Sequence, residues 1–367
     1  MNILILSTIS DVHAIAVHWG LTELGCESTF WDWEDFPATD VSSWSISSTR
    51  KPEMTLHIGE QICAAEFAAI WYRRPGKPIP SSQSHPDDSE FIRRESGTFL
   101  NNCLPFLAND KARWINHPHD ARYADNKLVQ LTLARELGFT IPDTLIGNDP
   151  ARVRQFFADH DGKVIYKGFL PNTWNKPGGG ATAVCTSALT REHVENDYAI
   201  SGCPGIYQER IETQYELRIT VMNDTVLTGR IDSQREGEVV DWRAELLGDR
   251  LPLQATTLPS HIKNACLALC RRLNLAFCAI DMIVTRTGEY VFLEVNEAGQ
   301  FLWKEHVDPN LPMLDTFCRA LMQRANIPVP DGAKTLRLSD WFASESHADF
   351  KAYLEYRENQ LQATTSA

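Results

Sequence analysis

The sequence lacks the segments that direct a protein into or across a membrane. Its 367 residues contain no apolar stretch of about 18 residues, the length a transmembrane helix requires. Residues 1–10, MNILILSTIS, have no positively charged region before the apolar run, unlike a secretory signal peptide. We therefore expect a cytoplasmic protein with no membrane partner.

Cysteine pairs with metal-binding or redox spacing are also absent. The 9 cysteines are scattered along the chain, and no CxxC pair occurs. Cys266 and Cys270 have the spacing of neighbours on one helix face. We interpret the cysteines as reduced thiols, which fits an intracellular protein.

Cationic residues are scarce relative to acidic ones. The chain has 35 Lys and Arg against 48 Asp and Glu, a formal net charge of −13. This balance argues against non-specific nucleic-acid binding, which needs clustered Lys and Arg. A phosphate ligand is not excluded, because a few local cations or a divalent metal can override the global charge.

The first residues predict an α/β domain. A strand over 2–7, a helix over 13–24 and a second strand near 28–33 follow one another, which is typical of a parallel sheet with a crossover helix. No GxGxxG motif follows the first strand, so the sequence gives no support for dinucleotide binding.

Further elements follow a boundary near residues 116–122. A helix over 125–138 is expected, capped by Asp125 and closed by Gly138. A hairpin is expected to turn at Asn223-Asp224, and an amphipathic helix to span 260–274. The polar tail beyond about residue 350 is expected to be frayed.

The last predicted hairpin places two acids opposite each other. With Thr287-Gly288 as a two-residue turn, Asp281 lies across from Glu294 and Ala279 across from Asn296. Because side chains alternate between faces of a strand, the other face is uniformly apolar core. The acidic face is expected to carry Asp281, Ile283, Phe292, Glu294 and Asn296.

Two directly opposed carboxylates repel unless a proton or a cation lies between them. Asp281, Glu294 and Asn296 form an all-oxygen set that suits Mg²⁺ or Mn²⁺. The alternative is a buried acid pair with arginine partners, for which Arg218 and Arg230 are the candidates.

A nucleotide bound at such a metal would need cations for its phosphates. Lys127 opens the helix after the boundary, and Lys167 ends a strand. A glycine-rich loop at 177–180 could cover a triphosphate with backbone amides. The strand end from Gln208 to Ile211 could offer backbone groups to adenine and a carboxylate to ribose.

The order of these motifs resembles the ATP-grasp superfamily over roughly residues 120–325. The resemblance implies that Lys127 and Lys167 hold phosphates and that Asp281, Glu294 and Asn296 hold Mg²⁺. It implies an N-terminal Rossmann-like domain at 1–120, ATP-grasp subdomains at 121–204 and 205–330, and an extension at 331–367. The adenosine side would comprise Gln208, Glu209, Arg210, Ile211 and Glu216.

Segments 1–37, 70–75, 125–149 and 229–243 resemble more narrowly the graspetide, or microviridin-type, peptide macrocyclases. These enzymes activate Asp or Glu side chains of a ribosomal precursor peptide as acyl phosphates and close ω-ester or ω-amide rings. The resemblance implies a ligase that uses ATP and Mg²⁺, binds a precursor peptide with a leader segment, and forms a homodimer.

Roles for the remaining candidates follow from that chemistry. Arg218 is expected to stabilise the γ-phosphate or acyl-phosphate oxygens, assisted by Arg230 and Lys167. Substrate binding is assigned to Arg73, Arg74, Asp241 and Arg243, with the two adjacent arginines holding acidic side chains of the peptide.

Two rival functions remain open from the sequence. One is an ATP-grasp ligase that adds an amino acid to a protein tail or joins free amino acids. The other is a non-catalytic nucleotide-binding or scaffold protein. The presence of the full set of expected phosphate-binding and metal-binding residues argues against it: Lys127, Lys167, Asp281, Glu294 and Asn296.

Overall fold

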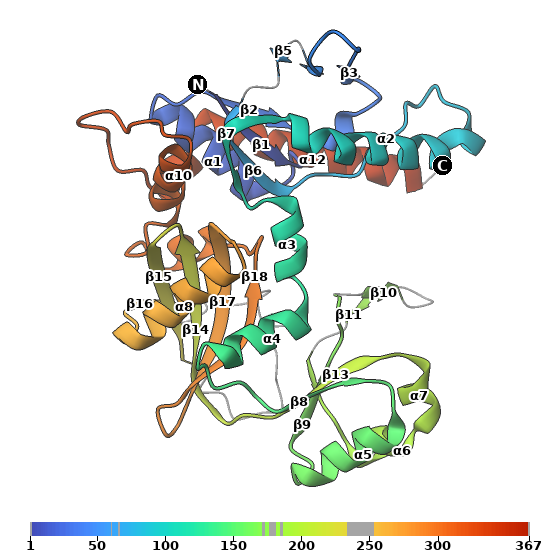
Figure 1. The fold of residues 1–367 in the computed structure, drawn as a ribbon, viewed down its shortest axis with the longest axis vertical. Coiled ribbons are helices and arrows are strands. Elements are labelled where there is room, and N and C mark those ends of the chain that lie inside the picture. The colour runs from blue at the N-terminus through green and yellow to red at the C-terminus, as the bar shows by residue number, and fades with distance from the viewer. Residues whose placement is uncertain are drawn as a thin grey trace.

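The computed structural model describes residues 2–59, 61–64, 67–170, 173–175, 181–183, 186–232 and 253–365, with the backbone alone at 61–64, 109–113, 173–175, 181–183 and 357–365. It has the predicted mixed α/β architecture, arranged as lobes around separate sheets (Figure 1). The expected glycine-rich loop at 177–180 lies outside the described residues, as do Asp241 and Arg243.

The N-terminal lobe contains a parallel sheet in the order β2-β1-β6-β7. Its strands are β1 (Asn2–Ser7), β2 (Ser28–Trp31), β6 (Phe67–Arg74) and β7 (Ala108–Ile115). The alternation predicted for the region after β2 forms a small antiparallel sheet of β3 (Val41–Ser45), β4 (Glu53–Ile58) and β5 (Gln61–Ala64). Helices α1 (Val12–Glu23) and α2 (Ser89–Cys103) belong to the same lobe (Figure 1).

The C-terminal extension completes the core of this lobe. Helices α10 (Met313–Arg324), α11 (Leu338–Phe342) and α12 (Glu345–Thr365) all contact α1. Leu314, Trp341 and Phe350 share one buried apolar cluster with Ile3 and Val17. Burial of Phe350 anchors the first turns of α12, and the frayed tail expected beyond about residue 350 stays a prediction.

A smaller lobe is built on the sheet β12-β9-β13-β8. Its strands are β8 (Thr144–Gly147), β9 (Val164–Lys167), β12 (Ser187–Ala188) and β13 (Gly205–Glu209). Helices α5 (Pro150–Asp159), α6 (Arg191–Glu195) and α7 (Asp197–Gly202) accompany it, and β10 (Thr173–Asn175) pairs separately with β11 (Ala181–Ala183) (Figure 1).

Two helices lead from the N-terminal lobe to this sheet, α3 (Pro118–Ala124) and α4 (Lys127–Glu136). Asn126 rather than Asp125 caps α4, since its side chain accepts hydrogen bonds from the backbone N–H groups of Leu128 and Val129. Asp125 instead ends α3. The predicted cap is therefore wrong by one residue.

The largest sheet is antiparallel, in the order β16-β15-β14-β17-β18. Its strands are β14 (Thr213–Met222), β15 (Thr225–Ile231), β16 (Leu253–Thr256), β17 (Phe277–Thr285) and β18 (Tyr290–Asn296). Helices α4 and α8 (Ser260–Arg272) bury apolar side chains against one face. The predicted turn at Asn223-Asp224 is confirmed, because Met222 pairs with Thr225.

The hairpin β17–β18 differs from prediction near its turn. Asp281 pairs with Glu294, as expected, but Met282 pairs with Phe292, which leaves Leu293 as an extra residue. The turn spans residues 286–288 rather than two residues, with Gly288 at positive φ. This β-bulge moves Phe292 into the apolar core against α4 and α8, so its predicted place on the acidic face is wrong.

None of the described helices has the length and apolarity of a membrane span.

Candidate active site

An arginine bridges the acidic residues on the face of the large sheet. Arg218 on β14 is the register partner of Asp281 on β17, which in turn pairs with Glu294 on β18. The Arg218 guanidinium forms ion pairs with Asp281 and, at 2.6 Å, with Glu216. The predicted alternative, an arginine partner for the acids, is therefore present in the structure.

Arg218 holds its charge despite its burial. Its side chain is 7% exposed. Burial would lower its pKa, but the charges of Asp281 and Glu216 outweigh that effect and raise the pKa above its ordinary value. The guanidinium is thus a fixed positive charge beside the carboxylates.

Lys127 contacts the other acid of the pair. Its ammonium lies 3.0 Å from Glu294 Oε2, and the side chains are 23% and 32% exposed. The Asn126 cap starts α4 at this residue. The helix start therefore brings a cation to the acidic group, and the predicted contact of Lys127 with phosphate stays a prediction.

The donor set suits a hard divalent cation. Asp281, Glu294 and Asn296 offer only oxygen ligands, and the two carboxylates remain accessible, with side-chain exposures of 19% and 32%. Asn296 is exposed at the end of β18, where its Oδ1 accepts a hydrogen bond from Ala298 N at 3.0 Å. The residues present fit Mg²⁺.

A buried lysine lies beneath this group, on α9 (Leu302–Val307). Lys304 is 2% exposed and donates to Thr220 Oγ1 at 2.6 Å and to Arg218 O at 3.3 Å. Burial lowers its pKa to about 7, against the attraction of Asp281. No local sequence pattern marks Lys304 as a site residue, because its two partners lie 84 and 86 residues earlier.

Two buried amides fix the strand that carries Glu294. Gln130 on α4 accepts from Val295 N and donates to Val295 O, so it completes the outer edge of β18 as a neighbouring strand would. Asn116 donates to Glu297 O and accepts from the N–H groups of Ala276 and Phe277. Neither residue was predicted, since their partners are backbone atoms distant in sequence.

Arg73 is enclosed rather than facing a cleft. Its side chain is fully buried and forms an ion pair with Asp11 at 3.1 Å. It also donates to the carbonyl groups of Ala298 and Gly299. The expectation that both arginines are available to the peptide is wrong for Arg73, which ties the N-terminal lobe to the loop after β18.

Arg74 is exposed and donates to Ala298 O at 3.1 Å. It therefore lies beside the end of the acidic strand, where a substrate carboxylate could reach it.

The residues predicted to bind the nucleotide lie on both sides of the segment where the chain passes from the smaller sheet to the large sheet. Lys167 ends β9, and Gln208 and Glu209 end β13, in the smaller lobe. Residues 210–212 then connect β13 directly to β14 of the large sheet (Figure 1). Gln208 is buried, with Nε2 donating to Thr144 Oγ1 at 3.0 Å. Glu216 instead lies with Arg218 in the acidic group.

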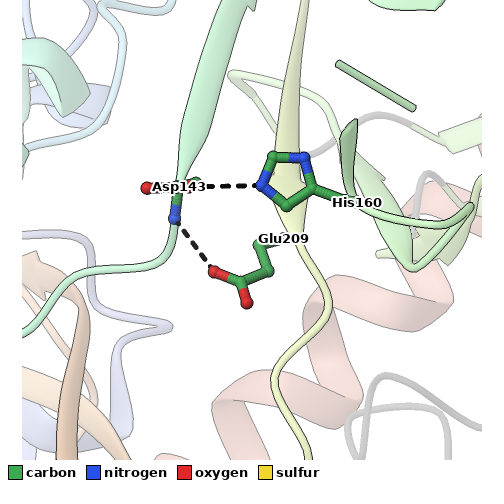
Figure 2. Close-up of side chains that lie close together, drawn as sticks. All are labelled: Asp143, His160 and Glu209. Atoms are coloured by element: carbon green, nitrogen blue, oxygen red, sulfur yellow. Dashed lines mark hydrogen bonds and ion pairs between the residues drawn. The ribbon is translucent and has the colours of Figure 1, made fainter. Parts of the chain in front are cut away.

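Glu209 belongs to a polar cluster at this segment (Figure 2). Asp143 N donates to Glu209 Oε2, while His160 Nε2 lies 3.2 Å from Asp143 Oδ2 and its Nδ1 lies 2.8 Å from Phe156 O. The hydrogen bond to Phe156 O, with smaller effects from the carboxylates, raises the pKa of His160. His160 therefore links the end of α5 to Asp143, which precedes β8.

Arg230 lies near the end of β15, an inner strand of the large sheet. Its guanidinium stacks 3.9 Å from the centre of the Tyr215 ring and forms an ion pair with Asp232 at 2.6 Å. It lies on β15, whose residue Gly229 is the register partner of Arg218.

Comparisons with known proteins place the fold among solved structures of ligases. Neither a protein-family profile nor a curated protein matches the sequence. Among solved structures, macrocyclase MdnC from Microcystis aeruginosa MRC, bound to precursor peptide MdnA, is 26% identical with a TM-score of 0.77, over 88% of this chain and 100% of its own.

A Chryseobacterium gregarium RiPP-associated ATP-grasp ligase, in complex with ADP and leader and core peptides, is 27% identical with a TM-score of 0.77. The match covers 91% of this chain and 99% of that one. ATP-grasp ligase PsnB, complexed with Mg, ADP and a precursor variant, is 23% identical with a TM-score of 0.66, over 88% and 98% of the two chains, and supports the fold.

The fold defines an ATP-grasp ligase, an enzyme that forms ester or amide bonds at the expense of ATP. Within that class, the chain resembles the peptide macrocyclases associated with ribosomal peptide modification.

Proposed function

We propose that this enzyme uses ATP to activate Asp or Glu side chains of a precursor peptide and closes ω-ester or ω-amide rings within that peptide. The observation that carries the proposal is the direct pairing of Asp281 with Glu294, flanked by Arg218 and Lys127. The peptides and ADP bound to the similar enzymes support the same substrates.

The reaction begins at a substrate carboxylate, which is a poor electrophile until it is activated. A carboxylate oxygen attacks the γ-phosphorus of ATP, the bond to the β-phosphate oxygen breaks, and ADP leaves. Lys127 and Lys167 would hold the phosphate chain, and Arg218 would stabilise charge on the transferred phosphoryl oxygens. The product of this step is an acyl phosphate.

Ring closure follows within the same bound peptide. A Ser or Thr hydroxyl or a Lys amine attacks the acyl carbon, loses its proton, and phosphate leaves. Because both reacting groups belong to one peptide, their effective concentration is high. Arg74 and, among residues outside the described part of the chain, Asp241 and Arg243 are proposed to position the peptide.

Mg²⁺, or Mn²⁺ in its place, would be held by Asp281, Glu294 and Asn296 and would neutralise phosphate charge when bound. The segment from Gln208 to Ile211 and Glu216 is proposed to bind adenosine. Arg230 would assist Arg218 from the neighbouring strand. The absence of disulfides among the described cysteines fits our proposal of a cytoplasmic enzyme.

The test combines the purified enzyme with ATP, Mg²⁺ and a peptide encoded beside its gene that is rich in Thr, Ser, Asp and Glu. Ring closure lowers the peptide mass by one water per ring. A gain in mass would instead favour a ligase that adds amino acids. Glu294→Gln is expected to abolish the mass change, whereas Glu355→Gln, which changes an exposed acid on α12, should preserve it.

The homodimer that the family resemblance implies remains part of the proposal. Sedimentation of the purified enzyme at several concentrations, with and without peptide, would measure it.

A further inference from the structure

A cavity of about 500 Å³ opens on the N-terminal lobe. It lies between residues 76–78, which follow β6, and helix α2, and Trp33 also lines it. A volume of this size is typical of small-ligand or side-chain pockets.

The cavity is basic in a protein that is acidic overall. Lys77, Arg93 and Arg94 line it, and none of the described residues that line it is acidic. Arg93 forms an ion pair with Glu90 at 2.5 Å. Among the described residues, Lys77 and Arg94 have no ion-pair partner. Against a net charge of −13, this local excess of cations favours an anionic ligand.

A buried aromatic ring forms part of the cavity wall. Trp33 lines the cavity and is 3% exposed, and its indole Nε1 is buried away from the open volume. Edge-on contacts with Trp31 and Tyr72 hold the ring, so it supplies an apolar side to the cavity beside the cations.

Helix α2 has no side chain at one position beside the cavity, because that residue is a glycine. Gly97 lies inside the helix and lines the cavity, yet a Cβ added there would meet no atom within 4 Å. Glycine is a poorer helix former than alanine, and no described neighbour requires it. Its effect is to leave room beside the cations.

The cavity is connected to the active site through one short stretch of chain. Arg74 contacts Ala298 O beside the acidic strand, and Lys77 follows it by three residues. Three residues span at most about 11 Å, so a ligand in the cavity lies within reach of Arg74.

We propose that this cavity is a docking site for an acidic side chain of the peptide substrate, at a distance from the residue that is activated. Lys77 and Arg94 would pair with the carboxylate. The identity of the peptide as substrate rests on the proposed function; the preference for a carboxylate in an extended peptide rests on the cavity.

The test measures fluorescence anisotropy of a labelled hexaglutamate peptide, without ATP, against a labelled hexaglutamine peptide. We expect the hexaglutamate peptide to bind and the hexaglutamine peptide not to bind. Changing Lys77 and Arg94 together to Gln should weaken binding about tenfold or more. Gly97→Leu should weaken it as well, although it changes no charge.

Arg152→Gln on α5 is the matched control, because it removes an exposed arginine far along the chain from the cavity. Equal weakening by Arg152→Gln, or none by the Lys77 and Arg94 changes, overturns the proposal. Displacement of hexaglutamate by equimolar inorganic phosphate would show a small-anion site and would also overturn it. ADP release with the gene-encoded peptide is measured separately, so failure of ligation and failure of docking are distinguishable.

Discussion

Lys304 Nζ lies 3.3 Å from Arg218 O and 2.6 Å from Thr220 Oγ1, so a buried ammonium supports the strand that carries the active-site arginine. Lys304 binds the backbone carbonyl of Arg218, so it fixes the main chain of the residue whose side chain lies among the carboxylates. The lysine acts on the site through the strand and is a positioning residue.

The first prediction concerns the pH dependence caused by Lys304. Its folded-state pKa of about 7 lies below the ordinary value of 10.5, so between these values the unfolded chain binds the extra proton and stability rises with pH. Lys304→Met removes this dependence. Its Tm relative to wild type should therefore be higher at about pH 6 than at about pH 9, by at least about 2 °C.

Lys263→Met on α8, an exposed lysine, is the control and should follow wild type at both pH values. A Tm difference for Lys304→Met that is the same at both would contradict the assigned pKa. Loss of ligase activity in Lys304→Met with a normal Tm would separately support the positioning role.

The second prediction concerns Lys127. Its ammonium contacts Glu294 and is proposed to contact phosphate, so Lys127→Met should raise the KM for ATP at least about tenfold. Steady-state ADP release measures it. Lys263→Met should leave the KM unchanged, and an unaltered KM in Lys127→Met would remove this residue from the nucleotide site.

The third prediction compares a buried and an exposed arginine. Arg218→Met leaves Asp281 and Glu216 without their cation and should lower the unfolding free energy by about 3 kcal/mol. Arg154→Met breaks an exposed pair with Asp197 and should cost less than about 1 kcal/mol. Denaturant titration of both variants checks the contrast; equal losses would argue against a stabilising bridge.

The fourth prediction concerns the cluster of Asp143, His160 and Glu209. The raised pKa of His160 means that its stabilising effect is fully present below its ordinary value of 6.5 and is lost as pH rises through the folded-state pKa. His160→Gln should therefore lower Tm at about pH 5.5 and have little effect at about pH 9.

His261→Gln, which changes an exposed histidine on α8 for which no described ion pair exists, provides the comparison and should leave Tm unchanged at both pH values. If His160→Gln lowered Tm only at the higher pH, the charged form would not be the stabilising one.

The acidic pair could be predicted from sequence because strand alternation and hairpin register depend on neighbouring residues. The turn was predicted wrongly, yet Asp281 still faces Glu294, because a third turn residue is compensated by the bulge at Leu293. Phe292 was misplaced for the same reason. A bulge is set by packing against α4 and α8, which local pattern does not contain.

The contacts that hold the site together were beyond sequence reasoning. Asn116, Gln130 and Lys304 bind backbone atoms, and a backbone atom leaves no residue-specific signal at its own position. Arg73 looked like a substrate residue because it follows a strand, but Asp11 and Ala298 enclose it. The division at residues 120, 204 and 330 and the roles of the site residues stay predictions.

The apolar cluster shared by α1, α10, α11 and Phe350 has a consequence for biosynthesis. Strands β1 and β2 and helix α1 leave the ribosome long before the helices α10, α11 and α12 that cover α1. Contacts between such distant parts of a chain form slowly. The N-terminal lobe is therefore expected to finish folding only after these helices have been translated, and to expose apolar surface to chaperones until then.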